Sequence, residues 1–201
     1  MNFAPILDVK RFGDYHAIGD RCFSEDIDII TKSGIKYINI LKKYNVIPII
    51  KHFPGHGATG KDTHFSIPKI KMNMQTLEKN DMIPFEKAIK NGADALLIGH
   101  LNLKKASSNL PATMSKKFIT DWVRKKYRYN GLVITDDMRM RAVKILYGKN
   151  RPIVKAIKSG NDIILFKYLN NDTVINNIMK KVKKGKIKEK RINKSVKKKG
   201  Y

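Results

Sequence analysis

The chain has 201 residues, a length that suits one domain, and 42% of them are hydrophobic, which is enough for a sizeable core. Its 42 Lys and Arg residues against 17 Asp and Glu give a net charge of +25, which taken alone would indicate nucleic acid or an anionic surface as a partner. The lysines are spread from end to end among many Ile and Asn residues, a pattern typical of a genome-wide compositional bias, so we expect no specific nucleic-acid binding. No apolar run reaches the roughly 18 residues of a membrane span.

Cysteine usage and the first residues bear on where the protein works. Cys22 is the only cysteine, so the sequence contains no disulfide framework, which fits a reducing compartment. No signal peptide opens the chain, because Met1 is followed at once by NFAPILDV, a stretch typical of a strand. We therefore expect a cytoplasmic protein; the alternative is secretion, if a signal was lost with a missing N-terminal part.

Short apolar segments recur along the chain and predict strands. Their nearly continuous Ile, Leu and Val content is typical of parallel strands that are buried on both faces. The expected strands cover residues 2–9, 46–53, 93–101, 131–137 and 161–166. Helical patterns lie between them, so the alternation indicates an α/β fold with a parallel sheet.

Two of the helical patterns are well defined. The first begins after Ser115, a capping residue, and ends before Gly131. Its apolar stripe consists of Phe118, Ile119, Trp122, Val123 and Tyr127. The second lies in residues 171–185, and its stripe consists of Val174, Ile175, Ile178, Met179 and Val182. The lysine-rich residues that follow are either a basic arm or a solvated, partly helical terminus.

Polar side chains stand at the carboxyl ends of the expected strands. In chain order they are Asp8, Lys51, His52, His100, Asp136 and Asp137. In a (β/α)8 TIM barrel, chemistry occurs at that rim. A doubly wound sheet would usually show a GxGxxG fingerprint after its first strand, and the segment DVKRFGDYHAIGDR contains none. We therefore expect a TIM-barrel type of α/β fold.

The segment IPIIKHFPGHGATGKDTHFSIP, residues 47–68, holds three of the five histidines. His52 and His56 have the spacing of two zinc ligands on one helical face, but the Pro54 and glycine residues around them indicate a loop, so that geometry is lost. A metal site assembled from the loop remains an alternative, although we expect neither a metal nor another cofactor. The stretch GHGATGKDT also lacks the spacing of a phosphate-binding P-loop.

A second hypothesis assigns a catalytic role to two other residues of the same segment, Asp62 and His64. Asp62 and His64 could form a dyad in which the carboxylate orients an imidazole that donates and accepts protons near neutral pH. Across the rim, Asp136 could serve as a nucleophile.

These residues resemble a known family. KHFPGHGATGKDTHFSIP is similar to the signature of family 3 glycoside hydrolases of the bacterial β-N-acetylhexosaminidase type. Four further segments resemble that family's successive segments in the same order: NFAPILDV, IGDRCF, LPATMSKKFITDWVRKKYRYNGLVITDDMRM and KAIKSGNDIILF. The resemblance extends to about residue 166 and continues weakly through RINKSV. The Asp-x-His pair separates this type from the β-glucosidases of the family, whose acid/base carboxylate comes from a second domain.

The resemblance implies a role for each matching residue. Asp136 matches the nucleophile of the family, His64 its general acid/base, and Asp62 the partner of that histidine. The residues that hold the sugar hydroxyls match Arg21, Lys51 and His52. The implied reaction is a retaining removal of terminal β-linked N-acetylglucosamine, typically from peptidoglycan fragments, with a histidine in place of the usual carboxylic acid.

The remaining rim residues have plainer interpretations. We expect Asp137 to cap a helix or support the site, His56 to orient its glycine loop, and His100 to pack at the rim or support the site. Asp8 is expected to shape the pocket floor, and Cys22 to be a small packing residue.

The resemblance also implies what precedes these segments. In the family, the barrel begins upstream of NFAPILDV with further strands and a loop similar to DQEGGRV, so we expect a barrel that lacks its first strands. Residues 1–170 would form this partial glycosidase domain, and residues 171–201 a C-terminal helix and basic tail. A separate N-terminal fragment is a possible partner, and a degenerate, non-catalytic carbohydrate-binding remnant is the alternative function.

Overall fold

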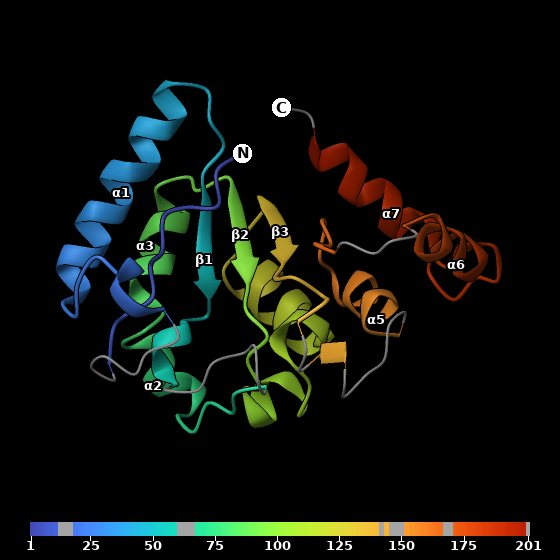
Figure 1. Ribbon diagram of the computed structural model, residues 1–201, viewed down its shortest axis with the longest axis horizontal. Coiled ribbons are helices and arrows are strands. Elements are labelled where there is room, and N and C mark those ends of the chain that lie inside the picture. The colour runs from blue at the N-terminus through green and yellow to red at the C-terminus, as the bar shows by residue number, and fades with distance from the viewer. Residues whose placement is uncertain (12–17, 60–66, 141–142, 145–150, 167–170, 200–201) are drawn as a thin grey trace.

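A computed structural model describes residues 1–11, 18–59, 67–140, 143–144, 151–166 and 171–199. Three parallel strands form the centre, β1 (Ile49–Phe53), β2 (Ala95–Ile98) and β3 (Leu132–Thr135). In Figure 1, α1 (Ile27–Lys43) and α3 (Ile83–Lys90) lie on one side of them, and α5 (Arg151–Ser159), α6 (Asn171–Lys183) and α7 (Glu189–Val196) on the other. The shorter elements are η1 (Gly19–Arg21), η2 (His56–Ala58), α2 (Met74–Glu78), η3 (Lys104–Ser107), η4 (Ala112–Met114), η5 (Lys117–Lys126) and η6 (Lys197–Lys199).

The strands lie side by side in chain order. β1 pairs with β2 through Ile49 and Ala95, and β2 pairs with β3 through Ala95 and Leu132. Isolated parallel bridges extend this order on both sides, joining residues 2–6 to β1 and Ile163 to β3. A strand order that follows the chain without reversal is that of a barrel, because a doubly wound sheet reverses its order in the middle. The expected α/β, TIM-barrel type of fold is confirmed for the described residues.

The first and last expected strands are shorter than predicted, for different reasons. Near the N-terminus, Pro5 has no N–H to donate to the ladder, although its carbonyl accepts from the Lys51 N–H at 3.2 Å. At the other edge, the Leu165 N–H donates to the Thr135 hydroxyl at 3.0 Å instead of a backbone carbonyl. Each ladder is therefore interrupted, and these segments form bridges rather than full strands.

Both faces of the sheet are buried, as their Ile, Leu and Val content predicts. One face forms a cluster of Ile49, Ala95, Leu97, Leu132 and Ile134. The alternate side chains of the same strands, including Phe53 and Leu96, join the larger core beneath α1, α3 and η5. The helices thus cover the outward face of the sheet, which leaves the strand ends as the rim on which a site can be built.

Local signals place two of these helices. The Asp26 carboxylate caps α1 by accepting from the N–H groups of Asp28 and Ile29. The Ser115 hydroxyl accepts from the Phe118 N–H at 3.2 Å, which confirms the expected cap of η5. This helix is wound as a π-helix, and its predicted apolar residues are buried or packed against the core. After it, a side chain at Gly131 would collide with the Asp94 carbonyl, so only glycine fits.

The C-terminal helices pack on α5 rather than trailing from it. Val174 of α6 and Ile187 are buried in a cluster that includes Ile153 and Ile157 of α5. The stripe predicted for α6 is only partly covered, since Ile175 and Met179 are about half exposed. The lysine-rich terminus is helical in part, through α7 and η6, and no helix among the described residues is long and apolar enough to span a membrane.

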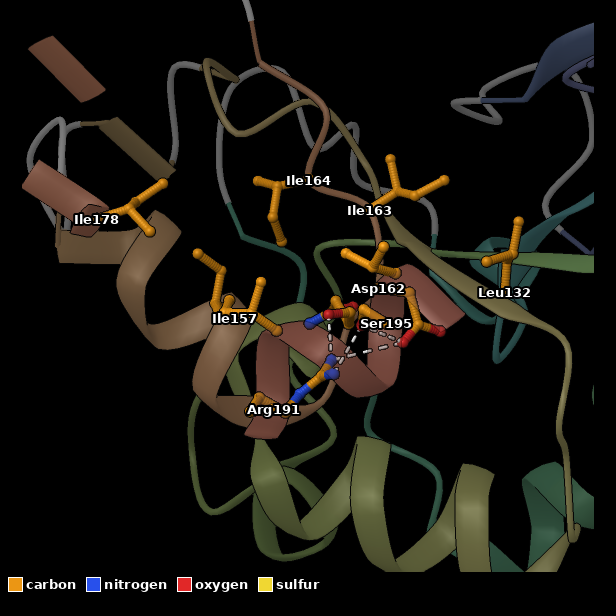
Figure 2. A pocket seen from close by; sticks show the side chains of 11 residues that line it. Leu132, Ile157, Asp162, Ile163, Ile164, Ile178, Arg191 and Ser195 are labelled. Atoms are coloured by element: carbon orange, nitrogen blue, oxygen red, sulfur yellow. Dashed lines mark hydrogen bonds and ion pairs between the residues drawn. The ribbon is translucent and has the colours of Figure 1, made fainter. Parts of the chain in front are cut away.

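A buried carboxylate anchors this terminus. Asp162 is at the amino end of the Ile163 segment, where its carboxylate accepts from the Val133 N–H at 3.0 Å and from the Ser195 hydroxyl at 2.6 Å. Arg124 forms an ion pair with it, and Arg191 lies 3.6 Å away. Figure 2 shows Arg191 and Ser195 of α7 directed toward Asp162 beside a cavity of about 360 Å³ lined largely by isoleucine side chains. Lys198, also 3.6 Å from Asp162, completes the group.

Candidate active site

The carboxyl ends of the first strand segment and β1 meet at a buried carboxylate. Asp8 is fully buried, and its Oδ2 accepts from the backbone N–H of His52 at 3.1 Å and lies 2.8 Å from Nδ1 of the His52 ring. Its Oδ1 accepts from the backbone N–H of His56 at 2.6 Å. A side chain at Gly57 would collide with the Val9 carbonyl, so glycine allows the loop to approach the first segment this closely. Asp8 therefore ties the loop of residues 52–57 to the sheet.

The charge state of Asp8 follows from these contacts. Burial by itself would raise its pKa, but the His52 ring and the hydrogen bonds from His52 and His56 outweigh it and hold the pKa below the ordinary value. The carboxylate is ionised and can only accept, so Nδ1 of His52 carries the proton. His52 is only 12% exposed, which suits a side chain that presents one nitrogen to a ligand.

Lys51 lies within electrostatic range of two other predicted site residues, Arg21 and Asp136. Burial lowers the pKa of the Lys51 ammonium, the neighbouring Arg21 lowers it further, and Asp136 and Asp8 oppose both effects. Lys51 is half-buried, and Arg21 is exposed with its Nε donating to the Ile18 carbonyl at 2.9 Å. The Lys51 ammonium thus lies near the Asp136 carboxylate and is repelled by Arg21.

Asp136 directly follows β3 and is held mainly through its backbone. Its N–H donates to the Ile98 carbonyl at 3.0 Å, which continues the pairing of β3 with β2. Its Oδ1 accepts from the N–H of Asp137 at 2.8 Å, which fixes the orientation of the carboxylate. The side chain is neither fully buried nor fully exposed, so a ligand at the rim can reach it.

The neighbouring acid has a different role. Asp137 accepts from the Arg139 N–H at 2.9 Å and forms an ion pair with the Arg139 guanidinium at 2.7 Å. Partial burial would raise its pKa, but the hydrogen bonds and charge of Arg139 bring the pKa below its usual range. Because its oxygens are occupied within its own turn, Asp137 supports the backbone, as expected, and is a poor candidate for the nucleophile.

His100 is buried at the rim, in line with the expectation that it packs there or supports the site, and Cys22 is partly buried. His100 is buried, with Nδ1 2.8 Å from the Thr113 hydroxyl and Nε2 3.1 Å from the Asp137 carbonyl. Burial lowers its pKa more than the nearby Asp136 charge raises it, so the ring is neutral. Burial beside Asp8 raises the pKa of the Cys22 thiol to about 11, which leaves the thiol protonated and unsuited to nucleophilic attack.

Two predicted catalytic residues, Asp62 and His64, lie outside the described residues. Their roles therefore remain predictions. Across the part of the chain that is described, no three His, Cys, Asp or Glu side chains are grouped so that they could hold a metal ion.

Sequence reasoning missed the central position of Asp8. It was expected to shape the pocket floor, yet it contacts both His52 and His56. The available signal was its place as the final polar residue of an apolar strand, at the same rim as Lys51 and His52.

Comparison with known proteins shows the family of the chain. Residues 1–198 match the model of the glycosyl hydrolase family 3 N-terminal domain. The chain belongs to that family. It is 34% identical over 164 residues to a β-hexosaminidase of Hydrogenovibrio crunogenus, an alignment that covers 82% of this chain and 45% of the relative.

Solved structures agree on the fold. A family 3 β-N-acetylglucosaminidase from Paenibacillus sp. str. FPU-7 is 31% identical, with a TM-score of 0.91, and the alignment covers 98% of this chain and 38% of that one. The zinc-bound CbsA of Thermotoga neapolitana is 30% identical, with a TM-score of 0.89 and coverage of 98% and 42%. The chain spans about half the length of the curated relatives that it matches.

Proposed function

We propose that this chain carries the retaining glycosidase reaction of the β-N-acetylhexosaminidase type, removing terminal non-reducing β-linked N-acetylglucosamine. The main support is the position of Asp136 at the carboxyl end of β3, on the same rim as Lys51, whose charge Asp136 stabilises. The relatives that share the fold support the same reaction, since they are named β-hexosaminidase and β-N-acetylglucosaminidase. Composition, by contrast, would have suggested a nucleic-acid partner.

The proposed reaction has two displacements. In the first, the Asp136 carboxylate attacks the anomeric carbon while the imidazolium of His64 protonates the departing glycosidic oxygen, which leaves a glycosyl–Asp136 ester. In the second, neutral His64 takes a proton from water, whose oxygen attacks the anomeric carbon and releases Asp136. Asp62 would orient the His64 ring and stabilise its charged form.

Substrate binding would fall to the other rim residues. Arg21 and Lys51 can donate to sugar hydroxyl oxygens, and Nε2 of His52 is left to bind a hydroxyl because Asp8 occupies Nδ1. We propose N-acetylglucosamine-containing peptidoglycan fragments in the cytoplasm as the substrate. Release of free N-acetylglucosamine from purified muropeptides, but not from chitin oligomers, would support this choice.

The edges of the described sheet support a partner segment. Among the described residues, large exposed apolar side chains occur only at the two ends of the array: Met1, Phe3, Phe23, Ile29, Tyr37, Ile40, Tyr44, Ile175, Met179 and Val196. We propose that the β/α units that precede this region in the family cover these surfaces, in the same polypeptide or as a separate fragment. A non-catalytic carbohydrate-binding remnant is the second candidate, because those surfaces are exposed here.

A chromogenic β-N-acetylglucosaminide tests the reaction in the protein supplied with those units. We expect hydrolysis without added metal and no effect of EDTA. Inhibition by EDTA that zinc reverses would instead revive a metal site in the histidine loop, a test made sharper by the zinc-bound relative. Sugar binding without any hydrolysis would favour the remnant.

His64→Ala tests the proposed acid/base. Substrates with poor leaving groups need the acid most, so natural disaccharides should lose far more activity than aryl glycosides with acidic phenols. Mass spectrometry of the variant should then show a glycosyl adduct on Asp136, because no base remains to activate water. Equal losses for good and poor leaving groups, or an adduct on Asp137, would contradict the assigned roles.

A further inference from the structure

The His100 side chain lies between Thr113 of η4 and the backbone carbonyl of Asp137, the residue after Asp136. His100 comes just after β2, its side chain is 1% exposed, and both ring nitrogens have a partner. Nε2 is 3.1 Å from the Asp137 carbonyl, and Nδ1 is 2.8 Å from the Thr113 hydroxyl. Both polar atoms of this buried ring are therefore satisfied by the protein.

The chemistry of the two partners fixes the proton on the ring. A carbonyl oxygen can only accept, so Nε2 of His100 carries the hydrogen and donates to Asp137. In the neutral ring Nδ1 must then accept, and the Thr113 hydroxyl donates to it. The direction of both hydrogen bonds follows, from Thr113 through the ring to the Asp137 carbonyl.

Thr113 is itself held from a third element. It is fully buried in η4, and its carbonyl accepts from the Asn161 side-chain amide at 2.8 Å. The same amide donates to the Ala156 carbonyl of α5, also at 2.8 Å. The backbone of Thr113, whose hydroxyl orients the His100 ring, is therefore linked through Asn161 to α5.

The peptide at the other end of this chain of hydrogen bonds joins Asp137 to Met138 and comes one residue after the proposed nucleophile, Asp136. The Asp136 N–H is held by the Ile98 carbonyl, and the Met138 N–H donates to the Leu165 carbonyl at 2.9 Å. The Asp137 carbonyl lies between those two anchors and accepts from His100. That carbonyl belongs to the Asp137–Met138 peptide, whereas the N–H that orients the Asp136 carboxylate belongs to the Asp136–Asp137 peptide, and the two peptides meet at the Asp137 α-carbon. Without the His100 donor, the Asp137–Met138 peptide is held only through the Met138 N–H, so the Asp137 backbone is less constrained and its N–H is free to shift.

We propose that His100, as the neutral Nε2–H tautomer held by Thr113, is a positioning residue for Asp136. It holds the Asp137–Met138 peptide and, through the Asp137 backbone and its N–H, the direction of the attacking carboxylate oxygen. A neutral ring is required, since an imidazolium here would pair with Asp136 and weaken it as a nucleophile. This proposal rests on the proposed glycosidase function for its kinetic consequence, but not for its geometry.

Two variants separate positioning from packing. His100→Gln keeps an N–H donor near the position of Nε2, whereas His100→Leu keeps the volume and removes the donor. We expect His100→Leu to lower kcat by about 10- to 100-fold with KM changed less than twofold, because a displaced nucleophile affects the chemical step rather than binding. His100→Gln should recover most of that loss. Equal losses in both variants, or a loss confined to KM, would overturn the proposal.

An NMR experiment on the ¹⁵N-labelled chain gives an answer that needs no glycosidase activity. Long-range proton–nitrogen spectra should show His100 at pH 7 with a protonated Nε2 and an unprotonated Nδ1. The amide resonances of Asp137 and Met138 should shift in His100→Leu and remain near their wild-type positions in His100→Gln. A charged ring, the opposite tautomer, or unchanged amides in His100→Leu would refute the positioning role. If the wild type hydrolyses nothing while these NMR results hold, the proposed function fails and the geometry stands.

Discussion

Asp136 and Asp162 are two carboxylates at opposite ends of the same strand pair, and their surroundings differ. Asp162, at the amino end, is 2% exposed and is contacted by three cations, a hydroxyl and a backbone N–H. Asp136, at the carboxyl end, receives one N–H from its neighbour and lies near the Lys51 ammonium, which Arg21 repels. The oxygens of Asp162 are occupied by protein hydrogen bonds and ion pairs, whereas the Asp136 carboxylate has fewer protein partners and can bind a ligand.

This difference shows how one fold separates stability from chemistry. In barrels of this type the amino ends of the strands serve stability, and the carboxyl ends carry the reacting groups. A cluster that served structure alone would not keep Lys51 beside Arg21, because burial and repulsion both disfavour the Lys51 charge. The predictions below exchange or remove charges at each end.

The largest expected effect is on catalysis at the carboxyl end. Asp136→Asn preserves the shape of the side chain but removes the nucleophile, so turnover should fall by at least about 1,000-fold for every substrate. The urea midpoint of unfolding should barely change, because the Asp137 N–H can still be bonded by the amide oxygen. A large loss of stability with residual turnover would mean that Asp136 belongs with Asp162 as a structural group.

The reverse pattern is expected at the amino end. Asp162→Asn leaves Arg124, Arg191 and Lys198 partly buried without a counter-charge and should lower the free energy of unfolding by about 3 kcal/mol. Urea denaturation would measure the loss, and kcat per folded molecule should be retained. Asp121→Asn is the matched control, since it removes an exposed ion pair with Lys125 and should leave the midpoint nearly unchanged.

Sequence alone predicted the carboxyl end better than the amino end. Strand ends, the Ser115 cap and the rim residues follow from local patterns of apolar and polar residues, which the structure retains. The contacts of Asp162 join residues 124, 133, 191, 195 and 198, and no local pattern records such distant partners. The exposure of Ile175 and Met179 was missed for a similar reason, because periodicity defines the apolar face of a helix but not what covers it.

Asp8 offers a test at the carboxyl end that depends on pH. Its pKa is lowered in the folded state, so its stabilising contribution is complete above its ordinary pKa of about 3.9 and is lost as the pH falls through the lower folded value. Asp8→Asn should therefore cost about 1–2 kcal/mol of unfolding free energy at pH 6 through weakened hydrogen bonds to His52 and His56.

The difference between wild type and Asp8→Asn should shrink as the pH is lowered below about 4, where Asp8 of the unfolded chain takes up its proton while the folded carboxylate is still ionised, and should be smallest below the folded-state pKa. Urea unfolding at pH 6, 4 and 3 measures this convergence. A difference that stays constant over the series would show that the Asp8 charge contributes nothing to the folded state.

The smallest effect has the opposite sign and addresses Lys51. Because the pKa of this base is lowered in the folded state, its charged form is less favourable there than in the unfolded chain, and removing the charge should stabilise the protein. Lys51 is only half-buried, so water screens the effect and we expect Lys51→Met to gain a few tenths of a kcal/mol at pH 7. The same variant should bind substrate more weakly, which would appear as a raised KM.

Lys32→Met, an exposed position on α1, controls for the loss of one positive charge in a strongly basic chain. If Lys51→Met were less stable than both wild type and this control, the Lys51 charge would be structural, and the distinction between the two ends of the sheet would fail at this residue.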